Sequence, residues 1–340
     1  MADSLIKDEW LNPRSPVGKR MVLLGGLIVA ILVVAAVGVA YVQTRRPLAR
    51  IIPSVQVVEQ VIPPRYLFSI YNVNEPFGVA TSPNGERVYV SELGGERQLK
   101  VFDRSGNLLF SSNPTGSVLP GRAPLYISVN SQGMVYVADR ARDELSIYSP
   151  EGKYVGKFEP NGDGGFVWSP IASTFDAQGN LYVTDATEGK HRVLIFDPSG
   201  RLVREFGKEG AGQGEFTFPN GIAVAADGRI FVANGNLGRI DMFDNKGNFL
   251  ASFGRGSGAG SIGLARGLAV DGDRLYAVDN VGHTVQVFGI VKDQPSYSFS
   301  LGSQGIENGQ LLYPNGVAVD ITGRVYVADR KNNRVQVWSY

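Results

Sequence analysis

The stretch PPRYLFSIYNVNEPFGVA, residues 63–80, lies near one end of a periodic sequence but matches a stretch near the other. It is built like QPSYSFSLGSQGIENGQLLYPNGVA, residues 294–318, with a proline, an aromatic-rich strand, a loop and an apolar run ending in Gly-Val-Ala. In the later copy the strand finishes one repeat and the apolar run begins the next. The earlier copy therefore predicts that residues 65–71 finish a repeat whose other strands lie elsewhere.

The repeat is marked by a strand with an aromatic second residue and a polar last residue. It reads VYVSE (88–92), VYVAD (135–139), LYVTD (181–185), IFVAN (230–234), LYAVD (275–279) and VYVAD (325–329). Glycine-containing turns separate the strands, because glycine readily adopts the positive φ of tight turns. A further strand that ends in an aromatic residue follows each time. Four strands in a repeat of about 47 residues are typical of a β-propeller blade.

The sixth repeat stops at Tyr340 after its third strand, so its outer strand is missing. RYLFSIY (65–71) is the right kind of strand to pair with RVQVWSY (334–340) and to complete that blade. An incomplete blade would leave an unpaired sheet edge and an open ring. The sequence therefore predicts an all-β fold over residues 65–340, a six-bladed β-propeller with four-stranded blades in which Phe68 lies beside Val337.

Residues 21–42 form an uncharged apolar stretch in front of the propeller. As a helix rising about 1.5 Å per residue, they would span roughly 33 Å, the thickness of a bilayer's hydrocarbon core. We expect one transmembrane helix there, a cytoplasmic tail at 1–20 and a proline-containing stalk at 43–64. A cleaved signal peptide is the alternative, although its apolar region is usually shorter.

Basic residues flank this span unequally, with four before it and three after it, which favours a cytoplasmic N-terminus. The propeller would then lie on the extracytoplasmic side of the cytoplasmic membrane. The first 43 residues contain four basic and three acidic side chains, so the remaining chain has 33 − 4 = 29 basic and 32 − 3 = 29 acidic residues. This neutral balance argues against a nucleic-acid partner. The absence of cysteine excludes disulfides and Cys-ligated zinc.

The second and third strands, with the turn between them, resemble the NHL repeat. The stretches that carry the resemblance are GRVYVADRKNNRVQVWS (323–339), GNLYVTDATEGKHRVLIFD (179–197) and DRLYAVDNVGHTVQVFG (273–289). The linker FGKEGAGQGEFTFPNGIAV (206–224) is similar to the family's connection between blades. The first two repeats depart from the signature because RQLKVFD and DELSIYS lack its His-Arg pair.

The resemblance covers about four-fifths of the chain and implies the propeller fold rather than one function. The family includes RNA-binding domains of animal tripartite-motif proteins, an amidating lyase, and sensor domains of bacterial membrane kinases. The family's lyase holds zinc with several histidines that converge on the channel. This chain has His191 and His283, at the same repeat position two blades apart, so we expect them to serve packing and local hydrogen bonds, with no metal site.

A repeated acid also has a structural interpretation. Asp139, Asp185, Asp279 and Asp329 each follow a second strand, and Arg192, Arg239 and Arg334 come early in third strands. This repetition predicts ion pairs or caps within blades rather than a catalytic acid. No cofactor is predicted; a calcium ion held by backbone carbonyls in the axial channel is compatible with the fold but leaves no mark in the sequence.

The candidate ligand-binding surface is the propeller face that carries the long loops between blades. Its aromatic and basic residues would suit a peptide, a glycan or a partner protein, and packing between blades is the alternative for Trp168 and Tyr313. The candidates are Trp168, Phe166, Tyr313, Arg140, Arg142, Lys190, Arg330 and Lys331.

The leading functional hypothesis is a membrane-anchored, extracytoplasmic, non-catalytic scaffold that binds a protein or polymer and can be a subunit of a membrane complex. An extracytoplasmic metal-dependent lyase or hydrolase is one alternative. A sensor subunit of a signalling system, with its output in another polypeptide, is the other.

Overall fold

The computed structural model describes residues 27, 30–35, 62–112, 123–162, 165–291 and 294–340. The chain divides into two compact units, residues 1–60 and 61–340. In the described part of the chain, no helix is both long enough and apolar enough to cross a bilayer. The predicted tail, most of the predicted transmembrane helix and nearly all of the stalk lie outside the described residues, and they stay predictions.

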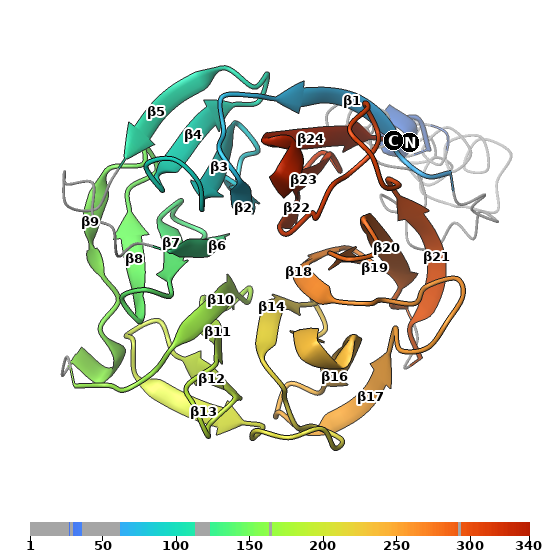
Figure 1. Cartoon of the computed structure of the whole chain (residues 1–340). Coiled ribbons are helices and arrows are strands. Elements are labelled where there is room, and N and C mark those ends of the chain that lie inside the picture. The colour runs from blue at the N-terminus through green and yellow to red at the C-terminus, as the bar shows by residue number, and fades with distance from the viewer. Residues whose placement is uncertain (1–26, 28–29, 36–61, 113–122, 163–164, 292–293) are drawn as a thin grey trace, which may run out of the picture. The chain divides into compact units, whose positions relative to one another are not determined.

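The second unit is a ring of six antiparallel four-stranded sheets (Figure 1). Blade 1 contains β2 (Pro76–Thr81), β3 (Arg87–Glu92), β4 (Leu99–Asp103) and β5 (Leu108–Ser112). Blade 2 contains β6 (Pro124–Val129), β7 (Val135–Asp139), β8 (Glu144–Tyr148) and β9 (Tyr154–Lys157). Blade 3 contains β10 (Pro170–Phe175), β11 (Leu181–Asp185), β12 (Arg192–Phe196) and β13 (Leu202–Phe206).

The other three blades repeat the plan. Blade 4 contains β14 (Pro219–Val224), β15 (Ile230–Asn234), β16 (Arg239–Phe243) and β17 (Phe249–Phe253). Blade 5 contains β18 (Ala265–Asp271), β19 (Arg274–Asp279), β20 (Thr284–Gly289) and β21 (Ser296–Leu301). Blade 6 contains β22 (Val317–Val319), β23 (Val325–Asp329), β24 (Arg334–Ser339) and β1 (Arg65–Ile70). Short 3-10 turns lie at η1 (Pro160–Gly162), η2 (Gly235–Leu237) and η3 (Arg330–Asn332).

Burial is greatest in the second strands and least in the outer strands, which explains the sequence pattern of each. Second strands such as β11 and β23 are buried along their whole length, and their sequences are almost continuously apolar. Outer strands such as β17 alternate between half-buried and exposed residues, as expected for a strand with one solvated face. The hydrophobic clusters draw residues from neighbouring blades, so the core lies between the sheets.

The predicted closure of the ring is confirmed. β1 pairs antiparallel with β24, and Phe68 is the direct partner of Val337. Figure 1 shows β1 as the outer strand of the blade that also holds β22 to β24. Ile70 and Val335 contribute to one buried cluster with the first blade, so the closing strand also supports the neighbouring sheet.

Blades approach most closely at the innermost strands. A Cβ built on Gly316 would lie 2.6 Å from the carbonyl oxygen of Phe77 in the next blade, and one on Gly267 would lie 2.6 Å from that of Asn315. Only glycine permits this backbone approach. The narrow axial channel that results has a cavity of about 280 Å³, lined by apolar side chains and a few hydroxyl groups such as Ser128.

Candidate functional site

The propeller has two unlike faces. We call the face with the interblade loops and the loops between second and third strands the loop face. The opposite turn face carries the tight turns between first and second strands and between third and fourth strands. The predicted ligand-binding residues all belong to loop-face segments.

The polar residue that ends each second strand holds the interblade loop of its own blade. Its side-chain oxygen accepts a backbone N–H from the loop that leads into the first strand, which satisfies a donor in an irregular segment. The bond recurs around the ring, from Asn74 to Glu92, Ala123 to Asp139, Ser169 to Asp185, Thr217 to Asn234, Leu264 to Asp279 and Leu312 to Asp329. We call this contact the loop clamp.

The predicted ion pairs within blades are confirmed in blades 3 and 6. Arg192 Nε lies 2.9 Å from Asp185 Oδ2, and Arg334 Nε lies 2.8 Å from Asp329 Oδ2. In blade 4 the clamp residue is Asn234, so Arg239 pairs instead with Asp241 on its own strand. The carboxylates of Asp185 and Asp329 are therefore engaged by cations and by backbone donors, as the structural interpretation predicted.

The two histidines connect adjacent blades. The backbone N–H of Phe218 donates to His191 Nδ1 at 3.2 Å, and that of Tyr313 donates to His283 Nδ1 at 3.0 Å. In each case the histidine belongs to one blade and the donor precedes the first strand of the next. The prediction of local hydrogen bonding is confirmed, and the bond is also a latch between blades.

Other residue types make the same latch elsewhere. Asn333 occupies the histidine position in blade 6, and its Oδ1 accepts the backbone N–H of Glu75 in blade 1 at 2.8 Å. Glu75 and Phe218 each directly precede the proline that begins a first strand, Pro76 in β2 and Pro219 in β14. Glu75, Phe218 and Tyr313 all have positive φ, at 43°, 65° and 50°, a conformation that side-chain-bearing residues seldom adopt.

The predicted ligand-binding aromatic residues differ in their exposure to solvent. Trp168 is only 7% exposed and packs against Phe166 and Phe196. Phe166 is half-buried against the same cluster. Tyr313 is 43% exposed and stacks edge-on against His283 at 4.6 Å between ring centroids. Packing between elements thus accounts for Trp168, and Tyr313 presents its ring to solvent.

Some of the predicted basic residues form ion pairs, and others do not. Arg330 and Lys331 both form ion pairs with Glu75, and Arg142 lies 3.7 Å from Glu144. Arg140 is exposed, and its guanidinium lies 4.7 Å from the ring centroid of Phe218. The Lys190 side chain is exposed as well. Arg140, Lys190 and Tyr313 are therefore accessible, and Lys331 is exposed as well but is ion-paired with Glu75.

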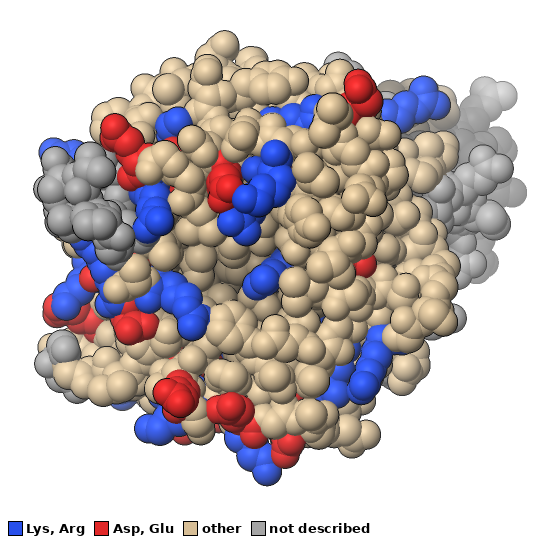
Figure 2. Space-filling view, viewed as in Figure 1, with Lys and Arg blue, Asp and Glu red and all other residues tan. Residues whose placement is uncertain are grey.

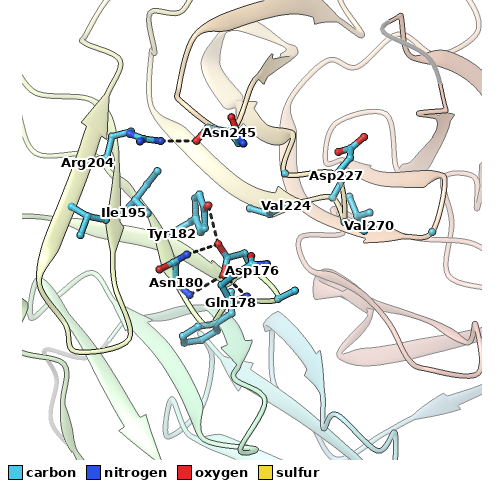
Figure 3. A pocket seen from close by; sticks show the side chains of 17 residues that line it. Asp176, Gln178, Asn180, Tyr182, Ile195, Arg204, Val224, Asp227, Asn245 and Val270 are labelled. Atoms are coloured by element: carbon cyan, nitrogen blue, oxygen red, sulfur yellow. Dashed lines mark hydrogen bonds between the residues drawn. The ribbon is translucent and has the colours of Figure 1, made fainter.

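A cavity of about 690 Å³ lies on the turn face between blades 3 and 4 (Figure 3). Its walls combine the turn that follows β10, the turn that follows β14 and side chains of β13, and Val270 and Gly272 of blade 5 complete the lining. Arg204 bridges the two blades by donating to the backbone carbonyl of Asn245 at 2.6 Å. Sequence reasoning missed this cavity, because it arises where turns of two blades meet and no motif marks it.

Of the two carboxylates that line this cavity, Asp176 and Asp227, the first holds its own turn. Asp176 Oδ1 accepts the backbone N–H groups of Gln178 and Asn180, and its Oδ2 accepts from the Tyr182 hydroxyl at 3.1 Å. Asp320 binds its own turn and Tyr326 in the same way in blade 6. Burial and the nearby Asp176 raise the pKa of Tyr182 to about 12. The hydroxyl therefore stays protonated at neutral pH and acts as a hydrogen-bond donor.

Comparison with known proteins supports the resemblance to NHL propellers. Residues 311–338 match the NHL repeat, and residues 169–228 match a family described as a 6-bladed beta-propeller. The chain is 29% identical over 170 residues to Protein brain tumor of Drosophila melanogaster, covering 45% of this chain and 15% of that protein. It is 29% identical over 196 residues to the probable peptidyl-alpha-hydroxyglycine alpha-amidating lyase pgal-1 of Caenorhabditis elegans, covering 54% of this chain and 50% of the other.

Solved structures share the fold at low sequence identity. A streptogramin B lyase superposes with a TM-score of 0.58 at 14% identity, over 81% of this chain and 97% of the lyase. A chain of a nidogen–laminin complex gives a TM-score of 0.55 at 15% identity, over 72% of this chain and 84% of that chain. A lyase and a component of a protein complex thus share this fold. The fold therefore does not indicate whether this chain is an enzyme or a binding protein.

Proposed function

We propose that this chain, an NHL-type six-bladed β-propeller, is a non-catalytic scaffold that binds a partner protein on its loop face. Residues 21–42 would anchor it in the cytoplasmic membrane, with the propeller on the extracytoplasmic side. The proposal is carried by Tyr313, an exposed aromatic residue on a latched loop. Its positive φ, its N–H bond to His283 and its ring contact with that histidine hold the side chain in one orientation.

An aromatic ring held in this way suits recognition. Residues held in sparsely populated backbone conformations concentrate at functional sites, and rigid aromatic residues dominate the energy of many protein interfaces. Ordering Tyr313 beforehand also lowers the entropy lost on binding. The acids and histidines beside it are committed to loop clamps and latches, which favours binding over proton transfer.

The test is to recover the full-length protein from its native membrane in a gentle detergent and to identify the chains that co-purify. Tyr313→Ala should reduce the yield of a specific partner at least fivefold, because truncation of an aromatic anchor commonly weakens an interface by about 2 kcal/mol. Tyr297→Ala is the matched control, since Tyr297 is 38% exposed but lies on the rim strand β21. Recovery of the wild-type chain alone, or equal loss with both variants, contradicts the proposal.

Elemental analysis of the same preparation distinguishes the lyase or hydrolase hypothesis. In the described part of the chain, no three acidic or histidine side chains are grouped to hold a metal ion. The scaffold hypothesis predicts no stoichiometric metal. Stoichiometric zinc, with loss of an activity upon chelation, would support a metal-dependent enzyme instead.

A further inference from the structure

A ring of residues, one from each blade, lies where the innermost strands begin at the loop face. It consists of the second residue of each first-strand segment, and it is apolar in blades 1 to 3 but polar in blades 4 to 6. The members are Phe77, Leu125, Ile171, Asn220, Arg266 and Asn315. We call this ring the axial mouth. In the view of Figure 2, Lys and Arg side chains lie around and within a central hollow.

Two residues at the axial mouth depart from the repeat. The next position is a small residue in five blades, glycine in blades 1, 4, 5 and 6 and alanine in blade 3, whereas blade 2 has Tyr126. In the ring itself, Arg266 of blade 5 is the one charged residue. Blades 2 and 5 face each other across the axis, as the positions of β6 and β18 show (Figure 1). The electrostatic effect of Arg266 reaches Tyr126, opposing the rise in the pKa of its hydroxyl that burial causes.

Both residues hold a buried polar atom without a hydrogen-bond partner among the described residues. These atoms are the hydroxyl oxygen of Tyr126, which is 6% exposed, and Nε of Arg266. The Tyr126 ring is fixed by an edge-on contact with Phe77 at 5.0 Å between centroids. A buried donor without a partner destabilises the protein, and a ligand that accepts its hydrogen bond would remove that cost.

A second arginine lies against the same part of blade 4. Arg266 Nη1 donates to Asn220 Oδ1 at 2.8 Å, and the Asn220 amide donates to the Phe218 carbonyl at 3.2 Å. The guanidinium of Arg140 covers the Phe218 ring. Within the described residues, neither guanidinium forms an ion pair with a carboxylate. Two positive charges that contact one short segment without a counter-charge favour the approach of an anion.

We propose that the axial mouth binds a carboxylate group, supplied by an acidic side chain of a partner protein, through Arg266 and Tyr126 with Arg140 at the rim. This inference rests on the proposed scaffold function and names the chemistry of its partner. A guanidinium fork matches the planar geometry of a carboxylate. The apolar half of the mouth, formed by Phe77 and its neighbours, suits the methylene groups of a glutamate. A single negative charge is also less costly to desolvate than a phosphate dianion.

The test measures binding of a fluorescein-labelled hexaglutamate peptide to the full-length protein in detergent, by fluorescence anisotropy at low ionic strength. Hexaglutamine is the uncharged control peptide and should not bind. Arg266→Gln should weaken hexaglutamate binding about tenfold, since a charge-assisted hydrogen-bonded pair is lost. Tyr126→Phe keeps the ring contact with Phe77 and should weaken binding about threefold through loss of the hydroxyl. Arg255→Gln, an exposed arginine on the loop before β18, should have no effect.

Several outcomes would overturn the proposal. Equal binding by wild type and Arg266→Gln would show that other charges attract the peptide. Tighter binding of a phosphoserine peptide of equal length would assign the mouth to phosphate. Arg266→Gln removes an unpaired charge but also the bond to Asn220, so the thermal midpoint should change little; a lowered midpoint with unchanged binding would make Arg266 structural.

The outcome is separable from that of the scaffold hypothesis. If a partner still co-purifies with Arg266→Gln but not with Tyr313→Ala, the carboxylate site is wrong and the scaffold function stands. If no partner is recovered but hexaglutamate binding depends on Arg266, the anion site stands without the scaffold.

Discussion

Single polar residues decide the shape of the loop face. Asp329 is fully buried, and it accepts bonds from the Leu312 backbone, Asn332, Arg334 and Gln336. The residue that forms the loop clamp is Asp, Glu or Asn in different blades. The clamp therefore requires a side-chain acceptor oxygen and does not require a negative charge. In blades with a paired arginine, the charge matters as well.

Asp329→Asn should therefore lower the free energy of unfolding by about 3–5 kcal/mol, because Arg334 is left as a buried cation without its counter-charge. Urea denaturation followed by tryptophan fluorescence measures the change. Asp227→Asn is the control: its ion pair with Arg229 leaves the Asp227 side chain 52% exposed, so the expected loss is below about 1 kcal/mol. Equal losses at the two sites would contradict the loop clamp.

The histidine latch makes a different prediction. His283→Ala should destabilise the protein by about 1–3 kcal/mol, since the Tyr313 N–H loses its acceptor and the ring contact is removed. His283→Asn should lose less, because Asn333 makes the equivalent bond to Glu75 in this chain. Thermal unfolding of both variants is the measurement. If asparagine were as damaging as alanine, the hydrogen bond would not be what the histidine provides.

At this scale the sequence predicted the repeated features better than the unique ones. The roles of His191 and Asp185 could be inferred because their positions recur. Trp168 was proposed as a ligand-binding residue, but composition does not reveal whether a loop aromatic turns inward or outward. Tyr126 and Arg266 differ from the residues at the equivalent positions of the other first strands, which could have marked them as candidate binding residues. This difference becomes visible only when the sequences of all six blades are aligned.

Among the elements, the junction between blades 6 and 1 is held by several polar contacts on the loop face. Glu75 pairs with Arg330 and Lys331, and its backbone N–H donates to Asn333. Hydrogen bonds from Lys331 and Arg330 hold the pKa of Glu75 below its usual value of 4.5. These contacts and the β1–β24 pairing secure the same junction.

A depressed carboxylate pKa stabilises the folded state above the usual pKa, and that contribution fades as the pH falls through the folded-state value. Glu75→Gln should therefore lower stability near pH 7 by up to about 1 kcal/mol, as expected for a partly exposed ion pair. The difference from wild type should shrink once the pH falls below 4.5. Thermal midpoints of both proteins across this pH range test the sign; a difference that grows on acidification would contradict it.

The strands themselves could be predicted because their alternation of apolar and polar residues, and the glycine turns between them, are local signals. The aromatic-marked second strands all appear where the sequence placed them, as β3, β7, β11, β15, β19 and β23. The cavity between blades 3 and 4 could not be predicted in this way. It depends on how the turn bearing Asp176 meets Asn245 in the next blade, which is a matter of packing between elements.

For the whole molecule, the decisive feature is that one blade is assembled from both ends of the periodic sequence. Arg65 and Ser339 are directly paired across β1 and β24. Because the chain has no cysteine, the variant Arg65→Cys/Ser339→Cys can form only one intramolecular disulfide. Oxidation should raise the free energy of unfolding by about 2–4 kcal/mol by restricting the unfolded chain.

Comparing the oxidised and reduced double variant in urea gives this difference directly. Each single variant, which cannot form the bond within one molecule, provides the control. Failure of the two thiols to link would be inconsistent with the pairing of β1 and β24 in the folded protein.

The shared blade also orders events during biosynthesis. A ribosome makes β1 first among the strands and β24 last, so the closing strand waits for its partner through translation of every other blade. Until then β1 exposes an edge that a chaperone, or a second nascent chain, could occupy. Premature termination upstream of residue 334 should consequently yield an open, association-prone ring rather than a smaller propeller, whatever the quality of the blades already formed.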